Sequence, residues 1–176
     1  MTRRGFTVVE LVITITVMGI LFALAVVNIN ASQANSRDSE RKGDAETIAT
    51  QLETFYTTTD SRVSQSGDAY PGTTRLTDAN IKATLPELDP KSSHAPGVSV
   101  TDPISIVAAT NTSETVGGII PQPTATTYVY QSLYSNGSLC TAPTATEYNA
   151  GECRKFNLYY YQEVDGSVQV IRSKHQ

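Results

Sequence analysis

The chain has 176 residues, a formal net charge of −4 and a pI near 5.1, which leaves room for one domain with an appendage. The acidic balance argues against a nucleic-acid binder, because such proteins usually carry a basic face that neutralises phosphates. Threonine and serine are abundant and tryptophan is absent, a composition that suits an exposed surface without specifying a function.

A long apolar run occupies the N-terminal part of the chain. Residues 6–29 contain a single ionisable side chain, Glu10, and residues 11–29 contain none. About twenty apolar residues, each rising 1.5 Å in a helix, match the hydrocarbon thickness of a bilayer. Arg3 and Arg4 precede the run, so the positive-inside rule places the N-terminus in the cytoplasm and the rest of the chain outside it.

Glu10 is the feature of this run that a simple membrane anchor does not explain. A carboxylate at that depth costs roughly 2.5–3.5 kcal/mol on insertion scales, so an acid there usually has a partner. A cleaved secretory signal is the alternative, since Ala23, Ala25 and Ala31 could imitate its cleavage site. Against it, the apolar run is longer than such a signal needs and continues into residues 30–56 without a proline.

The stretch RRGFTVVELVITITVMGILFALAVV resembles the N-terminus of type IV prepilins, a class that includes type II secretion pseudopilins and competence pilins. Five positions stand in register with the family's pattern: Gly5, Phe6, Thr7, Glu10 and Leu11. The stretch RDSERKGDAETIATQLETFY, followed by Tyr70-Pro71, extends the resemblance more loosely. The sequence departs from the family at Val27, where a proline is frequent.

The resemblance implies a particular processing of the N-terminus. A membrane peptidase would remove the leader after Gly5, and the new terminal amine of Phe6 would be methylated. That amine is a positive charge at membrane depth, and pairing with the Glu10 carboxylate would offset the desolvation of both groups. The amine could belong to the same chain or to a neighbour; a neighbour's amine would set the axial register of packed helices.

Beyond residue 30 the pattern becomes that of an amphipathic helix. Six apolar residues recur at spacings of three and four and form one stripe: Ala45, Ile48, Ala49, Leu52, Phe55 and Tyr56. The opposite face is expected to carry Arg41, Lys42, Asp44, Glu46, Gln51 and Glu53. Because no proline interrupts residues 6–59, we expect one helix of about 54 residues and roughly 80 Å, half membrane anchor and half support for a globular head.

Residues 61–176 are expected to form that head. LTDANIKATL predicts a short helix capped by Thr77 or Asp78, and VSVTDPISIVAA indicates two strands interrupted at Asp102-Pro103. TTYVYQSLY predicts a strand, and FNLYYYQEVDGSVQVIRS predicts a hairpin with Asp165-Gly166 in its turn. The many tyrosines of these segments are ordinary strand residues.

These elements predict an α+β fold, pilin-like in its plan, in which the long helix packs through its stripe on a small antiparallel sheet of three or four strands. The chain divides into a leader (residues 1–5), a transmembrane and polymerisation helix (6–29), an amphipathic extension (30–60) and a globular head (61–176).

The chain has two cysteines, Cys140 and Cys153, with twelve residues between them. A metal site would normally have more ligands at closer spacing, and a redox pair would read CxxC. A structural disulfide formed in an oxidising compartment is the favoured interpretation, with two unpaired buried thiols as the alternative. The resemblance adds that the bond would bridge two strands at the sheet's edge and bound a variable loop.

No catalytic motif is recognisable, since GxSxG, HExxH and phosphate-binding glycine-rich loops are all missing from the sequence. We therefore expect no enzymatic activity, no cofactor and no metal. Arg154, Lys155, Arg172 and Lys174 could combine into a small basic patch, which keeps DNA as a disfavoured partner.

The resemblance implies a structural subunit of a type IV pilus that serves adhesion, twitching motility or DNA uptake. The protein would span the plasma membrane once before assembly and lie in an extracellular pilus afterwards. Its partners would be copies of itself and other pilins in a helical filament, the prepilin peptidase and methyltransferase, the assembly platform in the membrane, and a host or partner cell surface. A type II secretion pseudopilin or minor pilin is the alternative; an anchored surface adhesin and a secreted enzyme with an uncleaved anchor are more remote.

Overall fold

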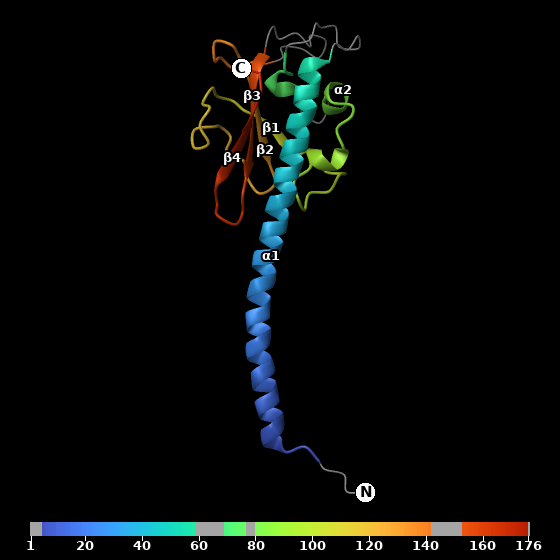
Figure 1. The fold of residues 1–176 in the computed structure, drawn as a ribbon, viewed down its shortest axis with the longest axis vertical. Coiled ribbons are helices and arrows are strands. Elements are labelled where there is room, and N and C mark those ends of the chain that lie inside the picture. Colours follow the sequence, from blue (N-terminus) through green and yellow to red (C-terminus); the bar gives the residue numbers. More distant parts are fainter. Residues whose placement is uncertain (1–4, 59–68, 77–79, 142–152, 176) are drawn as a thin grey trace.

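One long helix carries a globular head on its C-terminal half, while its N-terminal half extends away from that head (Figure 1). The structure is a computed structural model that describes residues 5–58, 69–76, 80–141 and 153–175. The leader before Gly5 and the helix caps expected at Thr77 or Asp78 lie outside the described residues.

The helix α1 spans Val8–Thr57, which is about 75 Å at 1.5 Å per residue. It begins two residues later and ends two residues earlier than the sequence pattern predicts. Thr7 is its N-cap, and the Thr7 hydroxyl accepts a hydrogen bond from the backbone N–H of Glu10. The helix continues without a break through Gly19 and Val27.

The apolar stripe of α1 faces the head as expected. Ala45, Ile48, Ala49, Leu52 and Tyr56 are buried, and Phe55 is half-buried against the same core. Full burial of an isoleucine or leucine side chain contributes about 1.5–3 kcal/mol, so this stripe holds the head on the helix mainly through the hydrophobic effect.

The head contains one sheet of four strands in the order β1-β2-β3-β4: β1 (Ile106–Ala108), β2 (Tyr128–Tyr134), β3 (Cys153–Tyr161) and β4 (Val168–Arg172). β3 is antiparallel to both β2 and β4, as predicted. β1 is parallel to β2, with Ile106 opposite Tyr128, so the expectation of a wholly antiparallel sheet is wrong at this edge. After β1 ends, residues 109–127 lead the chain back to the end of the sheet at which β1 began. β2 therefore runs in the same direction as β1, and the two strands pair in parallel.

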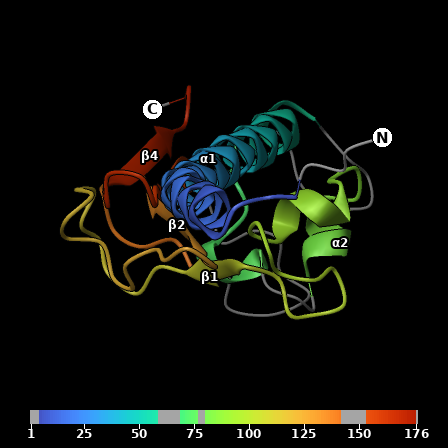
Figure 2. The same ribbon diagram turned by 90° about the horizontal axis from the view of Figure 1, so that it is seen from below.

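The two central strands are buried on both faces. Side chains such as Tyr130 and Leu158 pack toward α1, whereas Val129 and Tyr159 pack against Ala109 and other residues of the 109–127 connection. In the view from below, β4 and α2 lie on opposite sides of α1 (Figure 2). Burial on both faces explains why tyrosines of both alternations belong to the core.

The hairpin of β3 and β4 is confirmed, with Gly166 at a φ of 69° in its turn. The segment expected to hold two strands at residues 98–109 contains only β1, because residues 99–102 form a turn closed by Asp102 N–H donating to Ser99 C=O. The short helix α2 is confirmed but reduced to Ile81–Thr84. Two 3-10 turns, η1 (Thr73–Arg75) and η2 (Pro90–Ser93), complete the described elements.

Candidate assembly segment and the network that fixes the head

The candidate assembly segment is the N-terminal half of α1, residues 6–24, where every described side chain is exposed. Thirteen large apolar side chains in it have exposed fractions from 49% at Val12 to 83% at Phe6. Over its most apolar 18-residue window the mean hydropathy is 2.5, and none of that window is buried. The helix is therefore long and apolar enough to cross a membrane. An apolar surface of this size must be covered by lipid or by other helices.

Glu10 lies in the first turn of α1, three residues after the capping Thr7. The pattern T-x-x-E is that of a capping box, in which the threonine satisfies the backbone N–H of the glutamate. The positive end of the helix dipole also favours a carboxylate at this position. The cap explains where the helix begins, and the sequence contained this signal, although our sequence analysis did not use it.

The threonines of the assembly segment do not break its apolar character. The Thr16 hydroxyl donates to the Val12 carbonyl at 2.7 Å, and the Thr14 hydroxyl donates to the carbonyl oxygens of Glu10 and Leu11. Hydroxyls satisfied by the helix's own backbone cost little in an apolar environment. Glu10 is therefore the one side chain of residues 6–24 whose charge needs a partner from elsewhere.

The residues predicted for processing lie directly before the helix. Gly5 and Phe6 are exposed and precede the cap in non-helical backbone. A Cβ placed on Gly5 would meet no atom within 4 Å. Phe6, Thr7 and Glu10 lie close together in the chain at the N-terminal end of α1.

Cys140 and Cys153 form a disulfide, with their Cα atoms 5.7 Å apart and both residues buried. The bond joins the first residue of the central strand β3 to the segment that follows β2, so the expectation that it bridges two strands at the sheet's edge is wrong. A neighbouring segment reinforces it, because Tyr70 N–H donates to the Cys153 carbonyl and Thr73 N–H to the Cys140 carbonyl, both at 2.8 Å. The variable loop expected between the cysteines, residues 142–152, lies outside the described residues.

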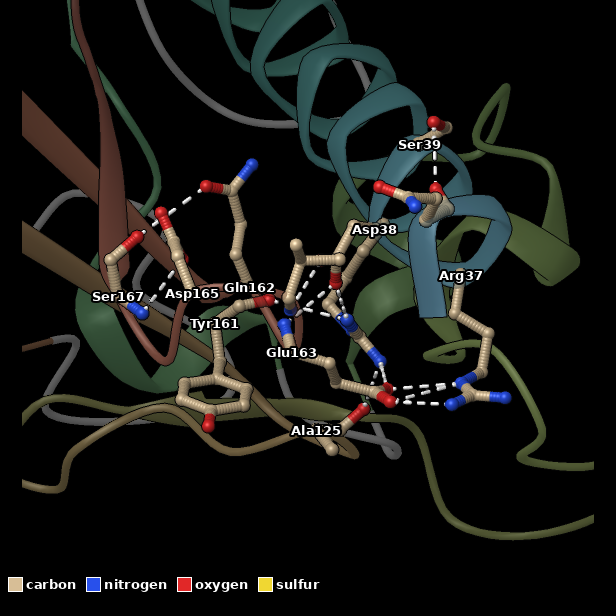
Figure 3. A network of polar contacts seen from close by, with 12 residues as sticks. Arg37, Asp38, Ser39, Ala125, Tyr161, Gln162, Glu163, Asp165 and Ser167 are labelled. Carbon is tan, nitrogen blue, oxygen red and sulfur yellow. Dashed lines mark hydrogen bonds and ion pairs between the residues drawn. The ribbon is translucent and has the colours of Figure 1, made fainter. Parts of the chain in front are cut away.

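An ion-pair network, formed by Arg37, Asp38, Arg41 and Glu163, joins α1 to the β3–β4 hairpin, with Asp38 and Arg41 buried (Figure 3). Arg41 Nη1 lies 2.7 Å from Asp38 Oδ1, and Arg41 Nη2 lies 2.5 Å from Glu163 Oε1. Arg41 also donates to the backbone carbonyls of Ala125 and Tyr161. One guanidinium thus ties the helix to two separate loops of the head.

Asp38 completes this link from the other side. Its carboxylate accepts the backbone N–H groups of Glu163 at 2.8 Å and Val164 at 3.0 Å, the first two residues after Gln162 in the hairpin turn. Hydrogen bonds from backbone amides to a carboxylate are directional. Together with Arg41 they fix both the distance and the rotation of the hairpin relative to α1.

The network strongly lowers the pKa of the Glu163 carboxyl group. Two cations lower its pKa from 4.5 to about 2: first Arg37, which binds both carboxylate oxygens, and then Arg41. Glu163 is therefore ionised at any pH near neutrality. The network contains two cations and two carboxylates, and this balance makes burial of the Arg41 charge tolerable.

A second contact holds the C-terminal segment on the far end of α1. The Glu53 carboxylate accepts the Tyr70 hydroxyl at 3.0 Å and the Lys174 backbone N–H at 2.8 Å. The rings of Tyr56 and His175 stack with centroids 4.3 Å apart. Burial, reinforced by the Glu53 carboxylate, raises the pKa of Tyr70. The head is thus attached to α1 at both ends of their contact.

The structure corrects the sequence analysis at Arg41. The helical pattern placed Arg41 on the solvent face, but its side chain is only 1% exposed. The reason is Glu163, an acid 122 residues later that periodicity along the helix cannot reveal. The spacing of Asp38 and Arg41, three residues apart on a helix, was the available signal for the local pair.

Among the described residues no group of three or more histidine, cysteine or acidic side chains is placed to hold a metal ion. Of the residues considered for a basic patch, Arg172 donates to the Glu114 carbonyl, and Lys174 takes part in the Glu53 contact through its backbone. The most distinctive features that remain are the exposed apolar half-helix and the fixed head.

Comparison with known proteins agrees with these features. Residues 1–26 match the family model described as the prokaryotic N-terminal methylation motif. A stretch of 58 residues is 39% identical to the type IV major pilin protein PilA of Myxococcus xanthus (strain DK1622), a match that covers 33% of this chain and 26% of that protein. No solved structure matches the chain. The resemblance to type IV pilins and pseudopilins is confirmed for the N-terminal part, and the long helix with its small sheet is an α+β, pilin-like architecture.

Proposed function

We propose that the protein is a structural subunit of a type IV pilus filament. It is inserted into the plasma membrane with its N-terminus in the cytoplasm, cut by prepilin peptidase after Gly5, methylated at Phe6, and assembled through residues 6–29 into a helical homopolymer outside the cell. The observation that carries the proposal is the half-helix that is apolar and exposed on all sides, yet contains the carboxylate of Glu10. Lipid can cover the apolar surface, but only a cation can compensate the carboxylate.

Cleavage after Gly5 supplies such a cation. It creates an amine on Phe6, one residue before the N-cap Thr7 and four before Glu10. Glu10 already has a favourable site at the N-terminus of its own helix, so an amine from a neighbouring subunit can pair with it without disturbing the cap. That pair would fix the axial offset between neighbouring helices, while their apolar side chains supply the packing energy.

The head contributes a rigid surface. Because the ion-pair network and the apolar stripe fix its position on α1, helices packed at a regular offset would present their heads at a regular offset as well. That surface would serve adhesion, twitching motility or DNA uptake. The same N-terminal motif supports a type II secretion pseudopilin or a minor pilin as the second candidate.

The experiment is to replace Glu10 in the full chain and to examine the producing cells for filaments by electron microscopy. Glu10→Ala should leave the protein in the membrane fraction, because removing a buried charge makes insertion easier, but it should abolish filaments. Thr16→Val on the same half-helix is the matched control and should leave filaments unchanged. Normal filaments from the Glu10→Ala chain would contradict the proposed pairing.

A further inference from the structure

The chain contains three copies of the tripeptide Asn-x-Ser, the acceptor pattern for N-linked glycosylation: Asn30-Ala31-Ser32, Asn111-Thr112-Ser113 and Asn136-Gly137-Ser138. A working acceptor needs an exposed asparagine whose carboxamide nitrogen makes no other bond, on a part of the protein that lies outside the cytosol. The structure separates the three by these criteria.

Two of the asparagines do not meet them. The Asn111 side chain is engaged on both sides, with Nδ2 donating to the Gly118 carbonyl at 2.7 Å and Oδ1 accepting the Ile120 N–H at 3.1 Å. Asn30 lies inside α1. Residues two apart on a helix do not face each other, so the Ser32 hydroxyl cannot reach the Asn30 carboxamide.

Asn136 meets the structural criteria. It is exposed in the turn that follows β2, and its Oδ1 accepts two hydrogen bonds from Ser138, one from the backbone N–H at 2.9 Å and one from the hydroxyl at 2.6 Å. Among the described residues no hydrogen bond engages Asn136 Nδ2. Gly137 permits the turn, with a φ of 81°.

The two hydrogen bonds from Ser138 also affect the reactivity of the Asn136 carboxamide. A carboxamide nitrogen is a weak nucleophile because its lone pair is delocalised onto the oxygen. When Nδ2 loses a proton, negative charge develops on Oδ1, where two donors already stand in place to stabilise it. The sequon serine is thus positioned to assist at Asn136, and at neither of the other two sites is such a contact found among the described residues.

We propose that Asn136 is the acceptor of an N-linked glycan. The donor is a sugar carried on a polyprenyl diphosphate, and the catalyst is an oligosaccharyltransferase of the membrane. Asn136 Nδ2 forms a bond to the anomeric carbon of the sugar. The bond from that carbon to the diphosphate oxygen breaks, and its electron pair goes to the diphosphate. The Nδ2 proton passes to a base of the transferase. No oxidation or reduction occurs.

The place of Asn136 in the head suits a bulky group. Tyr134 pairs with Cys153 at the start of β3, whereas the network that contacts α1 lies beyond the other end of β3, after Tyr161. The turn therefore lies at the end of the head that is farther from the assembly segment (Figure 1). A glycan there would cover the distal surface and leave the helix free to pack.

The test uses full-length protein purified from the cells that produce it, digested with chymotrypsin so that Asn136 and Asn111 fall on different peptides, and measured by mass spectrometry without reduction. The peptide containing Asn136 should carry a hexose-containing mass, and the peptides containing Asn30 and Asn111 should not. Ser138→Ala should abolish the added mass although Asn136 remains, Ser138→Thr should retain it, and Asn111→Gln should change nothing.

An unmodified or merely deamidated Asn136 would overturn the proposal, and so would a glycan that persists in the Ser138→Ala variant. The inference rests on the proposed location of the head outside the cytosol, and the same digest tests that location through the peptide linked by Cys140–Cys153. A linked peptide with bare Asn136 refutes the glycan alone. Reduced cysteines with bare Asn136 refute the glycan and also contradict the proposed location.

Discussion

At the scale of single residues, Arg41 shows what a buried charge does in this protein. Its guanidinium contacts two carboxylates and two backbone carbonyls at the junction of the helix and the head. Replacing a buried ion pair by apolar groups is often neutral, but removing one partner leaves the other charge buried and unpaired. The network therefore matters more for the geometry of the junction than for the total stability.

We predict that Arg41→Ala lowers the free energy of unfolding by about 3–5 kcal/mol, because the buried Asp38 carboxylate loses its cation, whereas Glu163 keeps its pair with Arg37. Lys42→Ala at the adjacent position is the control, because its pair with Glu46 is solvent-exposed and contributes at most about 0.5 kcal/mol. Chemical unfolding of the full chain in detergent, followed by the near-ultraviolet circular dichroism of its tyrosines, measures both. Equal losses in the two variants would contradict the assignment of Arg41 as the buried centre of the junction.

Glu163 should make stability depend on acid pH. Its pKa is about 2 in the folded protein and near 4.5 when unperturbed, so between these values the unfolded state binds more protons than the folded state. The contribution of Glu163 is complete above about pH 4.5 and is lost as pH falls toward about 2. The difference in melting temperature between the wild type and Glu163→Gln should therefore shrink over that interval. The exposed control Glu46→Gln should show no such trend, and a constant difference for Glu163→Gln would refute the assignment.

At the scale of elements, α1 is one helix with two functions that divide along its length. Two leucines of α1 show this division, because the Leu52 side chain is buried and the Leu21 side chain is 61% exposed. The first holds the head, and the second is available to lipid or to a neighbouring helix. The two leucines are therefore a matched pair for separating folding from assembly.

We predict that Leu52→Ala lowers the unfolding free energy of the head by about 2–5 kcal/mol, through lost burial and the cavity left behind. Leu21→Ala should leave that free energy unchanged within about 0.5 kcal/mol, because the side chain contacts no part of the head. Unfolding in detergent measures the first effect. A destabilised head in the Leu21→Ala chain would show that the two halves of α1 are not independent.

The same elements show how far the sequence predicts the structure. Helical periodicity located α1 and its buried stripe, and the Asp165-Gly166 turn located the hairpin, because both signals are local. β1 was placed in the wrong arrangement because its partner, β2, follows a 19-residue connection whose path no local pattern specifies. The burial of Arg41 was missed for a related reason, since its partner Glu163 is distant in the sequence. Glu10 stays a prediction, made because a lone acid in an apolar run is costly wherever the chain folds.

At the scale of the whole molecule, the protein is a fixed head on a helix whose other half is uncovered. The Cys140–Cys153 bond strengthens the head at the end opposite the ion-pair network, where residues 70–73 also attach. Both ends of the central strand β3 are thereby tied, one covalently and one by charge. Assembly through α1 and the stability of the head should accordingly be separable.

We predict that Cys140→Ser lowers the unfolding free energy by about 2–4 kcal/mol, the usual effect of opening a loop of this size. Reducing agent should produce the same loss in the wild type and no further loss in the variant. Membrane insertion should be unaffected, because the assembly segment makes no contact with the disulfide. A variant as stable as the wild type would show that the bond contributes nothing to the head.

Conversion of the N-terminus into the cationic partner of Glu10 is the central step of the proposed assembly. The intact mass and N-terminal sequence of the protein, isolated from the surface filaments of the producing cells, test this directly. We predict a chain that begins at Phe6 with a methylated amine. A chain that retains Met1 would indicate a simple membrane anchor, a chain that begins after residue 23 would indicate a cleaved secretory signal, and either result would contradict the proposed assembly.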